Sequence, residues 1–327
     1  MSETSGADLL EFFEERFGSG KGFTSEYIRY FEWSQNVKLR SAADWETLDA
    51  TRRMWLDFAL STNRRGEALM DLLETRGALR GRRYLDIGCG FGGFLVAAGR
   101  RGAVCAGVES DPLRLDFARA NTADWGVEAL LVEAEPLAPG VTERLGRFDV
   151  VSIGDAMERG GSPAALLAGV RKMVNGGGLV YAQFPNGGAI RAVESDGRFG
   201  LFGMTLLAGG EAKRYHWEHF HWHYEGGDYY SFDECARFFR DAGLRAQLVD
   251  SVWHPASAVS EAAGLVAALD AAREKFHDPD PRIHGRIDEA FGEYRRKLED
   301  DRASMTDEEF QNHYLRSFWT FLAEPVS

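Results

Sequence analysis

Long apolar runs are absent from this chain, and cysteine is scarce. No segment of the 327 residues approaches the roughly 20 consecutive apolar residues that a membrane-spanning helix needs. Residues 1–15 are acidic and lack the basic start and apolar core of a secretory signal peptide. The three cysteines, Cys89, Cys105 and Cys235, are too few for a disulfide framework and lack the spacing of metal ligands. We therefore expect a cytoplasmic protein with no membrane contact and no cysteine-based metal site.

Runs of positive charge are missing as well. The formal net charge is −13 at pH 7, and the isoelectric point is about 5.2. Proteins that bind nucleic acid carry clustered lysine and arginine side chains that neutralise phosphates, and no basic run occurs here. The charge balance therefore argues against a nucleic-acid partner.

The chain does contain a glycine-rich turn between an apolar strand and a helix. The strand is predicted over residues 83–87, and a second strand over residues 104–109 ends in the acidic Glu109. Strand, glycine turn, helix and strand in this order form a mononucleotide-binding unit. Side chains in the turn would hold the backbone away from the ligand, and Cβ atoms disfavour its backbone angles. A carboxylate at Glu109 can accept hydrogen bonds from both ribose hydroxyls. The glycines of the turn are Gly88, Gly90, Gly92 and Gly93.

Two classes of ligand use such a turn, and Asp86 discriminates between them. Gly88, Gly90 and Gly93 fit the dinucleotide pattern G-x-G-x-x-G, which alone is weak evidence. Asp86 lies two residues before the first glycine, where its charge would repel the pyrophosphate of a dinucleotide. The same charge would attract the α-ammonium group of S-adenosylmethionine. Asp86 therefore favours S-adenosylmethionine, and a nicotinamide-dependent oxidoreductase is the least favoured interpretation.

Four segments of the chain, in this order, resemble motifs of class I S-adenosylmethionine-dependent methyltransferases. Residues 86–92 look like the first motif of that family, and residues 147–151 look like its fourth strand. Residues 155–159 resemble the loop after that strand, and residues 172–180 resemble the turn into the fifth strand. Within the family, the chain looks most like bacterial methyltransferases that act on small molecules and glycans. The residues implied to bind the cofactor are Asp86, Gly88, Cys89, Gly90, Phe91, Gly92, Glu109, Ser110, Glu133, Ala134 and Asp155.

The resemblance also implies what these residues do. Backbone amides of the turn hold the methionine portion, Asp86 contacts its amino group directly or through water, and Glu109 binds the ribose. Glu133 closes the third predicted strand, where the family commonly keeps an acid for the adenine amino group, and Glu135 is the alternative. The alternative explanation for Glu109 and Glu133 is that they bind no ligand, since the exposed end of a strand accommodates an acidic residue without any functional need. Asp155 either lines the methyl-transfer side of the site or caps a helix.

Alternating strands and helices predict an α/β fold with a parallel sheet. The resemblance implies a Rossmann-like, doubly wound, mostly parallel sheet of seven strands. The seventh strand is not evident in the sequence. Gly264–Leu269 is either that strand or part of a helix. Thr306 and Glu309 form a capping-box pattern that predicts a helix over Phe310–Leu322. The six strands that the sequence does predict cover residues 83–87, 104–109, 129–133, 148–153, 178–184 and 244–252.

The same pattern divides the chain into three parts. Residues 1–80 are predicted to form a helical cap, because apolar and aromatic residues recur there at helical spacing. Residues 81–255 form the S-adenosylmethionine-binding domain, with a lid insertion over residues 187–230. Residues 256–327 form a mainly helical extension. The helical ends offer a surface on which a homodimer can form.

The lid insertion carries a run of histidine and aromatic residues over 215–224. As a strand, this run would place His219, His221 and His223 on one face. Three interpretations stay open: packing of the lid, a catalytic base, and binding of a divalent metal. A hydroxyl acceptor loses its proton as it attacks the methyl carbon, and imidazole titrates near neutrality. His219 and His221 are therefore the candidate bases, and Asp155 is a third candidate catalytic residue.

These patterns together predict transfer of a methyl group from S-adenosylmethionine to a small molecule. The expected acceptor is a hydroxyl oxygen of a sugar or secondary metabolite, with nitrogen or carbon as the alternative. A non-catalytic scaffold that keeps the methyltransferase fold is a further alternative. Because the sulfonium is already a good leaving group, we expect catalysis to depend mainly on aligning the reacting atoms in a dry pocket.

Overall fold

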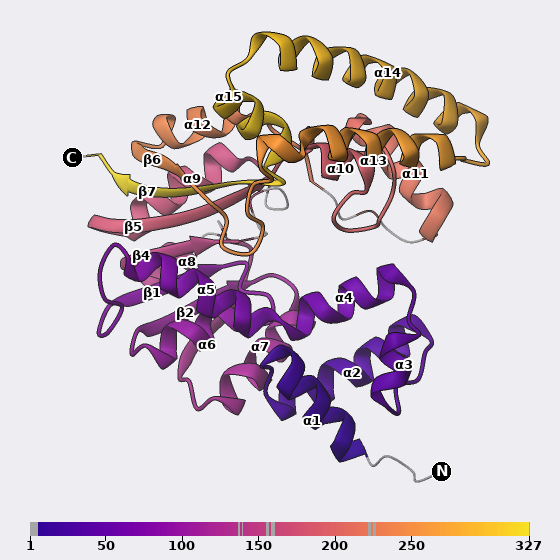
Figure 1. Ribbon diagram of the computed structural model, residues 1–327. Helices are drawn as coiled ribbons and strands as arrows, with labels where there is room; N and C mark the ends of the chain where they lie inside the picture. Colours follow the sequence, from indigo (N-terminus) through magenta and orange to yellow (C-terminus); the bar gives the residue numbers. More distant parts are fainter. Residues whose placement is uncertain are drawn as a thin grey trace.

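A single mixed sheet forms the centre of the molecule in the computed structural model (Figure 1). The structure describes residues 6–136, 138, 140–154, 157, 161–221, 224 and 227–326. Within these residues, seven strands follow the order β3-β2-β1-β4-β5-β7-β6. The first five are parallel, and β7 runs antiparallel to β5 and β6, which confirms the expected mostly parallel α/β sheet. The strands are β1 (Arg83–Ile87), β2 (Val104–Glu109), β3 (Ala129–Glu133), β4 (Phe148–Ile153), β5 (Val174–Pro185), β6 (Leu244–Val249) and β7 (Phe318–Pro325).

The strand order reverses at β1, which pairs with β2 on one side and with β4 on the other. In open α/β sheets, ligands bind outside the carboxyl ends of the strands at such a reversal. The ends of β1 and β2 carry Gly88 and Glu109. The topology therefore brings the glycine turn and this carboxylate to the edge where a ligand binds.

Helices cover both faces of the sheet, and alternation along the strands explains how. Successive side chains of a strand point to opposite faces. In β1, Leu85 and Ile87 join the core beneath α9 and α12, whereas Tyr84 joins the core beneath α5 and α6. Burial on both faces accounts for the mainly apolar composition of the central strands β1, β2, β4 and β5. The helices that flank the sheet are α5 (Thr62–Glu74), α6 (Gly93–Arg100), α7 (Pro112–Asp124), α8 (Val141–Leu145), α9 (Pro163–Met173) and α12 (Phe232–Asp241).

The helix starts follow capping signals in the sequence. Asp111 and Ser162 each accept a hydrogen bond from the first turn of the following helix, and proline occupies the first helical position. Ser231 and Glu234 form a reciprocal capping box at α12. These local interactions satisfy N–H groups that the first turn of a helix cannot pair internally.

The N-terminal helices have an aromatic core of their own. Phe13, Phe23 and Phe31 are buried there, and Phe117 of α7 joins the same cluster. Asp124, at the end of α7, accepts hydrogen bonds from the backbone N–H groups of Gly22 and Phe23 at 3.1 and 2.8 Å. The cap is thus anchored to the helix that follows β2. Its helices are α1 (Gly6–Phe17), α2 (Lys21–Gln35), α3 (Ala42–Glu46) and α4 (Ala50–Leu60).

The lid insertion and the C-terminal helices share a second separate core. Figure 1 shows these helices grouped in the upper part of the view and α1 to α4 in the lower part. The indole N–H of Trp55 in α4 donates to the carbonyl of Arg198 at 2.8 Å, which joins the two groups. The elements of this layer are α10 (Ile190–Glu194), η1 (Met204–Leu206), α11 (Gly209–Phe220), η2 (Val259–Glu261), α13 (Ala262–Lys275), α14 (Pro281–Ser304), α15 (Asp307–Phe310) and the π-helix η3 (Gln311–Leu315).

One predicted helix differs from the structure, and the structure decides one open alternative. The capping box at Thr306 and Glu309 is present, but the helix after it ends early, and the end of the predicted helix Phe310–Leu322 lies in β7. Pairing with both β5 and β6 fixes this segment as a strand. Gly264–Leu269 lies within α13 and is therefore not the seventh strand.

The histidine-rich run is mostly helical in the structure. Up to Phe220 it belongs to α11, and His221 follows as a C-cap in the left-handed conformation with φ 57°. Ala212, Tyr215 and His216 form the buried stripe of that helix, at the spacing of one helical face. The strand arrangement considered for the histidines therefore does not occur in this part of the run, while Trp222 and His223 lie outside the described residues.

Candidate cofactor site

The glycine turn leads directly from β1 into α6. Gly88, Gly90 and Gly92 have φ values of 70°, 50° and 74°, in the left-handed region that side chains disfavour. A Cβ atom at Gly92 would lie 3.1 Å from Cα of Ala118. At Gly90, the nearest described atom to an added Cβ would be the carbonyl oxygen of Gly88, 3.9 Å away. The turn is therefore packed against α7 at Gly92 and has open space in front of Gly90.

Cys89 and Phe91, the two residues with side chains in the turn, both pack against neighbouring elements. Cys89 is buried, and its sulfur fills the space over Gly107, where an added Cβ would come within 2.8 Å. Burial raises the pKa of Cys89 well above its ordinary value, and the charges of Asp86 and Glu109 raise it further. This thiol therefore stays protonated and acts as a small packing group.

Phe91 connects the turn to the N-terminal cap. Its ring centroid lies 5.3 Å from that of Tyr27 and 5.9 Å from that of Phe23. The carbonyl of Phe91 accepts a hydrogen bond of 2.8 Å from the Asn121 side chain, and Asn121 is paired with Asn63 of α5. The cap helices therefore help to fix the conformation of the turn.

Glu109 faces the turn from the end of β2. Its side chain is buried and accepts hydrogen bonds from the backbone N–H groups of Gly90 at 2.9 Å and Asp111 at 3.0 Å. Two backbone donors on different oxygens fix the orientation of the carboxylate. Ser110 follows directly in the chain and is exposed.

Asp86 supplies a second buried carboxylate on β1, with only 3% of its surface exposed. Ser152 of β4 donates a hydrogen bond of 2.6 Å to its Oδ1 atom. Two acids next to one turn give this edge a negative charge, which suits a cationic group better than a phosphate.

Most predicted cofactor residues meet at this edge. Glu109 and Glu133 are register partners at the ends of β2 and β3, and the N–H of Ala134 donates to the carbonyl of Glu109 at 3.1 Å. Glu133 is exposed, as is expected at the end of an edge strand. Asp155 lies outside the described residues.

The predicted histidines lie in the helical layer rather than at the turn. Nε2 of His219 lies 2.9 Å from Oδ2 of Asp278, whose side chain is fully buried. The Tyr215 ring packs edge-on against His219 at 5.0 Å. His221 is exposed and contacts the Trp217 ring. Among the described residues, no group of three or more histidine, cysteine or acidic side chains has the arrangement of a metal site.

Two residues of possible relevance to function, Trp253 and Asp278, were not anticipated from the sequence. Trp253, in the segment after β6, packs against Phe94 at the start of α6 and against Tyr181 of β5, with ring centroids 5.7 and 6.2 Å apart. Asp278 was not among the site residues predicted from the sequence. It lies three residues after the end of α13, and nothing in the local sequence indicates that it is buried, so its contact with His219 was visible only in three dimensions.

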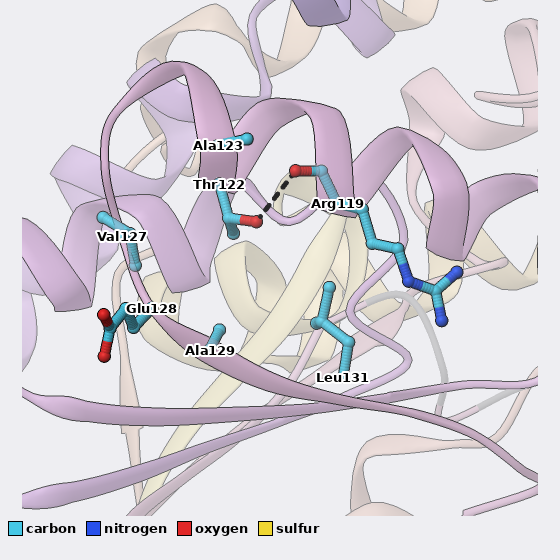
Figure 2. A pocket seen from close by; sticks show the side chains of 7 residues that line it. All are labelled: Arg119, Thr122, Ala123, Val127, Glu128, Ala129 and Leu131. Carbon is cyan, nitrogen blue, oxygen red and sulfur yellow. Dashed lines mark hydrogen bonds between the residues drawn. The ribbon is translucent and has the colours of Figure 1, made fainter.

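A hollow of about 430 Å³ lies elsewhere, between α7 and the edge strand β3 (Figure 2). Its walls come from the second half of α7 and the first half of β3, whereas Glu109 and Glu133 lie at the opposite ends of their strands. It is wide open and belongs to a different part of the surface from the glycine turn. The residues that line it are Arg119, Thr122, Ala123, Val127, Glu128, Ala129 and Leu131.

Comparison with known families agrees with this geometry. A doubly wound sheet with a glycine turn and two acids at its carboxyl edge is typical of Rossmann-like proteins that bind a nucleoside-containing cofactor. The family described as "Methyltransferase domain" matches residues 61–249, more than half of the chain, and the chain belongs to this family. Its cofactor is S-adenosylmethionine.

The curated relatives match only a third of the chain. The chain is 30% identical over 108 residues to a ubiquinone biosynthesis O-methyltransferase of Acinetobacter baumannii (strain ACICU), a match that covers 33% of this chain and 46% of that protein. It is 32% identical over 111 residues to the protein of the same description in Pseudomonas aeruginosa (strain LESB58), covering 33% and 47%. The chain thus spans about half the length of these curated relatives.

One solved structure is similar to this chain at low sequence identity. An S-adenosylmethionine-dependent methyltransferase from Mesorhizobium loti shares 17% identity, with 79% of this chain and 97% of that chain covered and a TM-score of 0.45.

None of the described helices combines the length and apolar composition that crossing a lipid bilayer requires.

Proposed function

We propose that this protein transfers a methyl group from S-adenosylmethionine to a hydroxyl oxygen of a small molecule, such as a sugar or secondary metabolite. The observation that carries the proposal is the pair of buried carboxylates, Asp86 and Glu109, on either side of an open glycine turn. The O-methyltransferase descriptions of the curated relatives support oxygen over nitrogen or carbon as the acceptor atom.

The residues of the turn fit the cofactor in shape and charge. Open space in front of Gly90 leaves room for a ligand against the backbone, and Glu109 is already oriented by two backbone donors. We assign Glu109 to the ribose, Asp86 to the α-ammonium group, and Glu133 with Ala134 to the adenine side. Gly88, Cys89, Gly90, Phe91, Gly92 and Ser110 complete the proposed cofactor site, and Asp155 stays a predicted member of it.

When bound, the cofactor supplies an electrophilic methyl group on a sulfonium. The protein must then orient an acceptor, exclude water and accept a proton. We propose His219 as the base, because its neighbour Asp278 is an obligate acceptor when ionised and so holds the proton on Nε2, leaving Nδ1 to take a proton. His221 and Asp155 are the alternative catalytic residues from the sequence, and packing of the lid is the alternative role for His219.

Calorimetric titration with S-adenosylhomocysteine and, separately, with NADH tests the cofactor assignment. We expect micromolar binding of S-adenosylhomocysteine alone, weakened about tenfold or more, which is about 1.4 kcal/mol, in Asp86→Ala and in Glu109→Ala. Glu128→Ala is the matched control, because it removes an acid from the hollow beside β3 and should leave the affinity unchanged. Binding of NADH in place of S-adenosylhomocysteine would overturn the proposal.

The base assignment has a separate test, in which a panel of hydroxylated sugars and phenols is screened for S-adenosylhomocysteine production. With an active acceptor, His219→Ala should lower kcat about 100-fold or more and leave cofactor affinity unchanged, and Asp278→Asn should lower kcat less. The exposed His221→Ala is the comparison variant. If His219→Ala lowers only the thermal midpoint, its role is packing.

A further inference from the structure

A chain of two hydroxyl groups lies beneath Asp86, inside the sheet. Asp86 and Ser152 are register partners on the parallel strands β1 and β4. The Ser152 hydroxyl lies 2.6 Å from Oδ1 of Asp86 and 2.6 Å from the Tyr84 hydroxyl. Tyr84 and Ser152 are fully buried, and Asp86 is 3% exposed. The three side chains share the face of the sheet that packs on α5 and α6, because residues two apart on a strand point the same way.

The protons in this chain have one consistent direction. An ionised carboxylate only accepts hydrogen bonds, so Ser152 donates to Asp86. The oxygen of Ser152 then accepts from Tyr84. Burial raises the pKa of Tyr84 well above its ordinary value, and the charge of Asp86 raises it further, so the phenol keeps its proton. The carbonyl of Leu85 lies farther from the Ser152 hydroxyl, at 3.4 Å, and is the weaker competitor for its proton.

We infer that Ser152 and Tyr84 are positioning residues that hold the Asp86 carboxylate in place for the α-ammonium group of the cofactor. Phenylalanine in place of Tyr84 and alanine in place of Ser152 would fill nearly the same space without burying these two hydroxyl groups. Burial of two hydroxyls is costly unless they are hydrogen-bonded, and here both bonds lead to the one acid that the turn requires. The inference rests on the proposed function, since it concerns the ligand-binding role of Asp86.

Two ligands separate positioning from general packing. S-adenosylhomocysteine carries the amino acid portion that Asp86 is proposed to contact, whereas 5′-methylthioadenosine has the same adenosine and thioether but lacks that portion. A positioning role predicts a loss for the first ligand alone. A structural role predicts equal losses for both, because the ribose and adenine sites would be disturbed as well.

The variants are Ser152→Ala, Tyr84→Phe and Ser152→Thr, measured by calorimetry beside the wild type. Ser152→Ala should weaken S-adenosylhomocysteine about tenfold and methylthioadenosine by less than about twofold. Tyr84→Phe keeps the ring and should show a smaller selective loss, while Ser152→Thr keeps the hydroxyl and should restore the affinity. Thr320→Val is the control, since it removes a fully buried hydroxyl of β7 from the same sheet and should affect neither ligand.

The possible outcomes are distinct. Equal losses for both ligands, or unchanged binding in Ser152→Ala and Tyr84→Phe, would overturn the positioning role while leaving the proposed function intact. Failure of the wild type to bind S-adenosylhomocysteine would overturn the proposed function, and this inference with it. Thermal midpoints of all variants identify any that do not fold, and Tyr84→Phe decides the question if Ser152→Ala is among them.

Discussion

At the scale of single residues, the three thiols show how strongly burial controls chemistry in this protein. Cys89, Cys105 and Cys235 are all buried and unpaired. Burial is the main cause that raises the pKa of Cys105 and of Cys235 to about 12, and nearby acids, Asp86 and Glu234, add to the shift. A thiolate is the reactive form of cysteine, so none of these groups is a nucleophile at neutral pH.

The raised thiol pKa values make a prediction about alkaline stability. From an ordinary value of 9 up to about 12, the unfolded chain loses the Cys105 and Cys235 protons while the folded chain keeps them. The contribution of these two thiols to the free energy of unfolding should therefore be constant below pH 9 and fall as the pH rises above it, by about 1.4 kcal/mol per pH unit for each thiol. Urea titrations between pH 8 and 11 measure this slope, which should be shallower by that amount in Cys105→Ala.

The control for this prediction is Val96→Ala, which shortens a buried side chain of α6 without removing a titrating group. It should lower the free energy of unfolding equally at each pH. If the curve for Cys105→Ala runs parallel to that of the wild type, the thiol does not titrate differently in the two states.

At the scale of elements, the crossing of α5 and α6 depends on two glycines. A Cβ atom on Gly66 of α5 would lie 2.3 Å from the carbonyl oxygen of Gly93, and one on Gly93 would lie 2.3 Å from the carbonyl oxygen of Thr62. Both obstacles are backbone atoms, which cannot rotate away. The close contact sets the position of α6, and the glycine turn forms the start of that helix.

Alanine at these helical glycines should therefore have opposite effects in different helices. Gly66→Ala and Gly93→Ala should each lower the free energy of unfolding by about 2 kcal/mol or more, because the helices must separate. Gly264→Ala, in α13, meets no described atom within 4 Å and should raise it by about 0.5–1 kcal/mol through helix propensity. Urea unfolding of the three variants measures both signs, and a stabilising Gly93→Ala would contradict the close crossing.

The elements that local signals define were predictable from the sequence. The glycine turn, the caps at Asp111 and Ser162 with a proline directly after each, and the capping box at Ser231 each act within a few residues, and all occur in the structure. The secondary structure of the run at 215–224 was not decided from the sequence, because its histidine and aromatic residues fit either period. The spacing of Ala212, Tyr215 and His216, three and four residues apart, was the helical signal that could have decided it.

At the scale of the whole molecule, β7 could not be predicted because its conformation depends on distant partners. Residues after Thr306 begin with a true capping box and continue with apolar residues, which fits a helix as well as a strand. The segment becomes a strand by pairing with β5 and β6, more than 70 residues earlier in the chain. The same reason hid the pairing of Asp86 with Ser152, since register between strands is a property of the assembled sheet.

The interior place of β7 leads to a last prediction. Trp319, Phe321 and Leu322 are buried, and Phe321 packs against Phe184 and Phe239 on the side of α12. Without β7, the backbone groups of β5 and β6 lose their partners, and one face of the core opens. A chain that ends at Leu315 should therefore lose cooperative urea unfolding, and Phe321→Ala in the full chain should cost about 3–5 kcal/mol.

A chain that ends at Pro325 is the control, because it keeps β7 and removes only residues outside the strand. It should unfold like the full chain. A synthetic peptide of residues 316–327, added to the truncated chain, should restore part of the cooperative transition if pairing with β5 and β6 is what the truncation removes. Cooperative unfolding of the truncated chain alone would mean that the first five strands and β6 form a stable unit, and that the sheet does not need its last strand to hold the cofactor edge together.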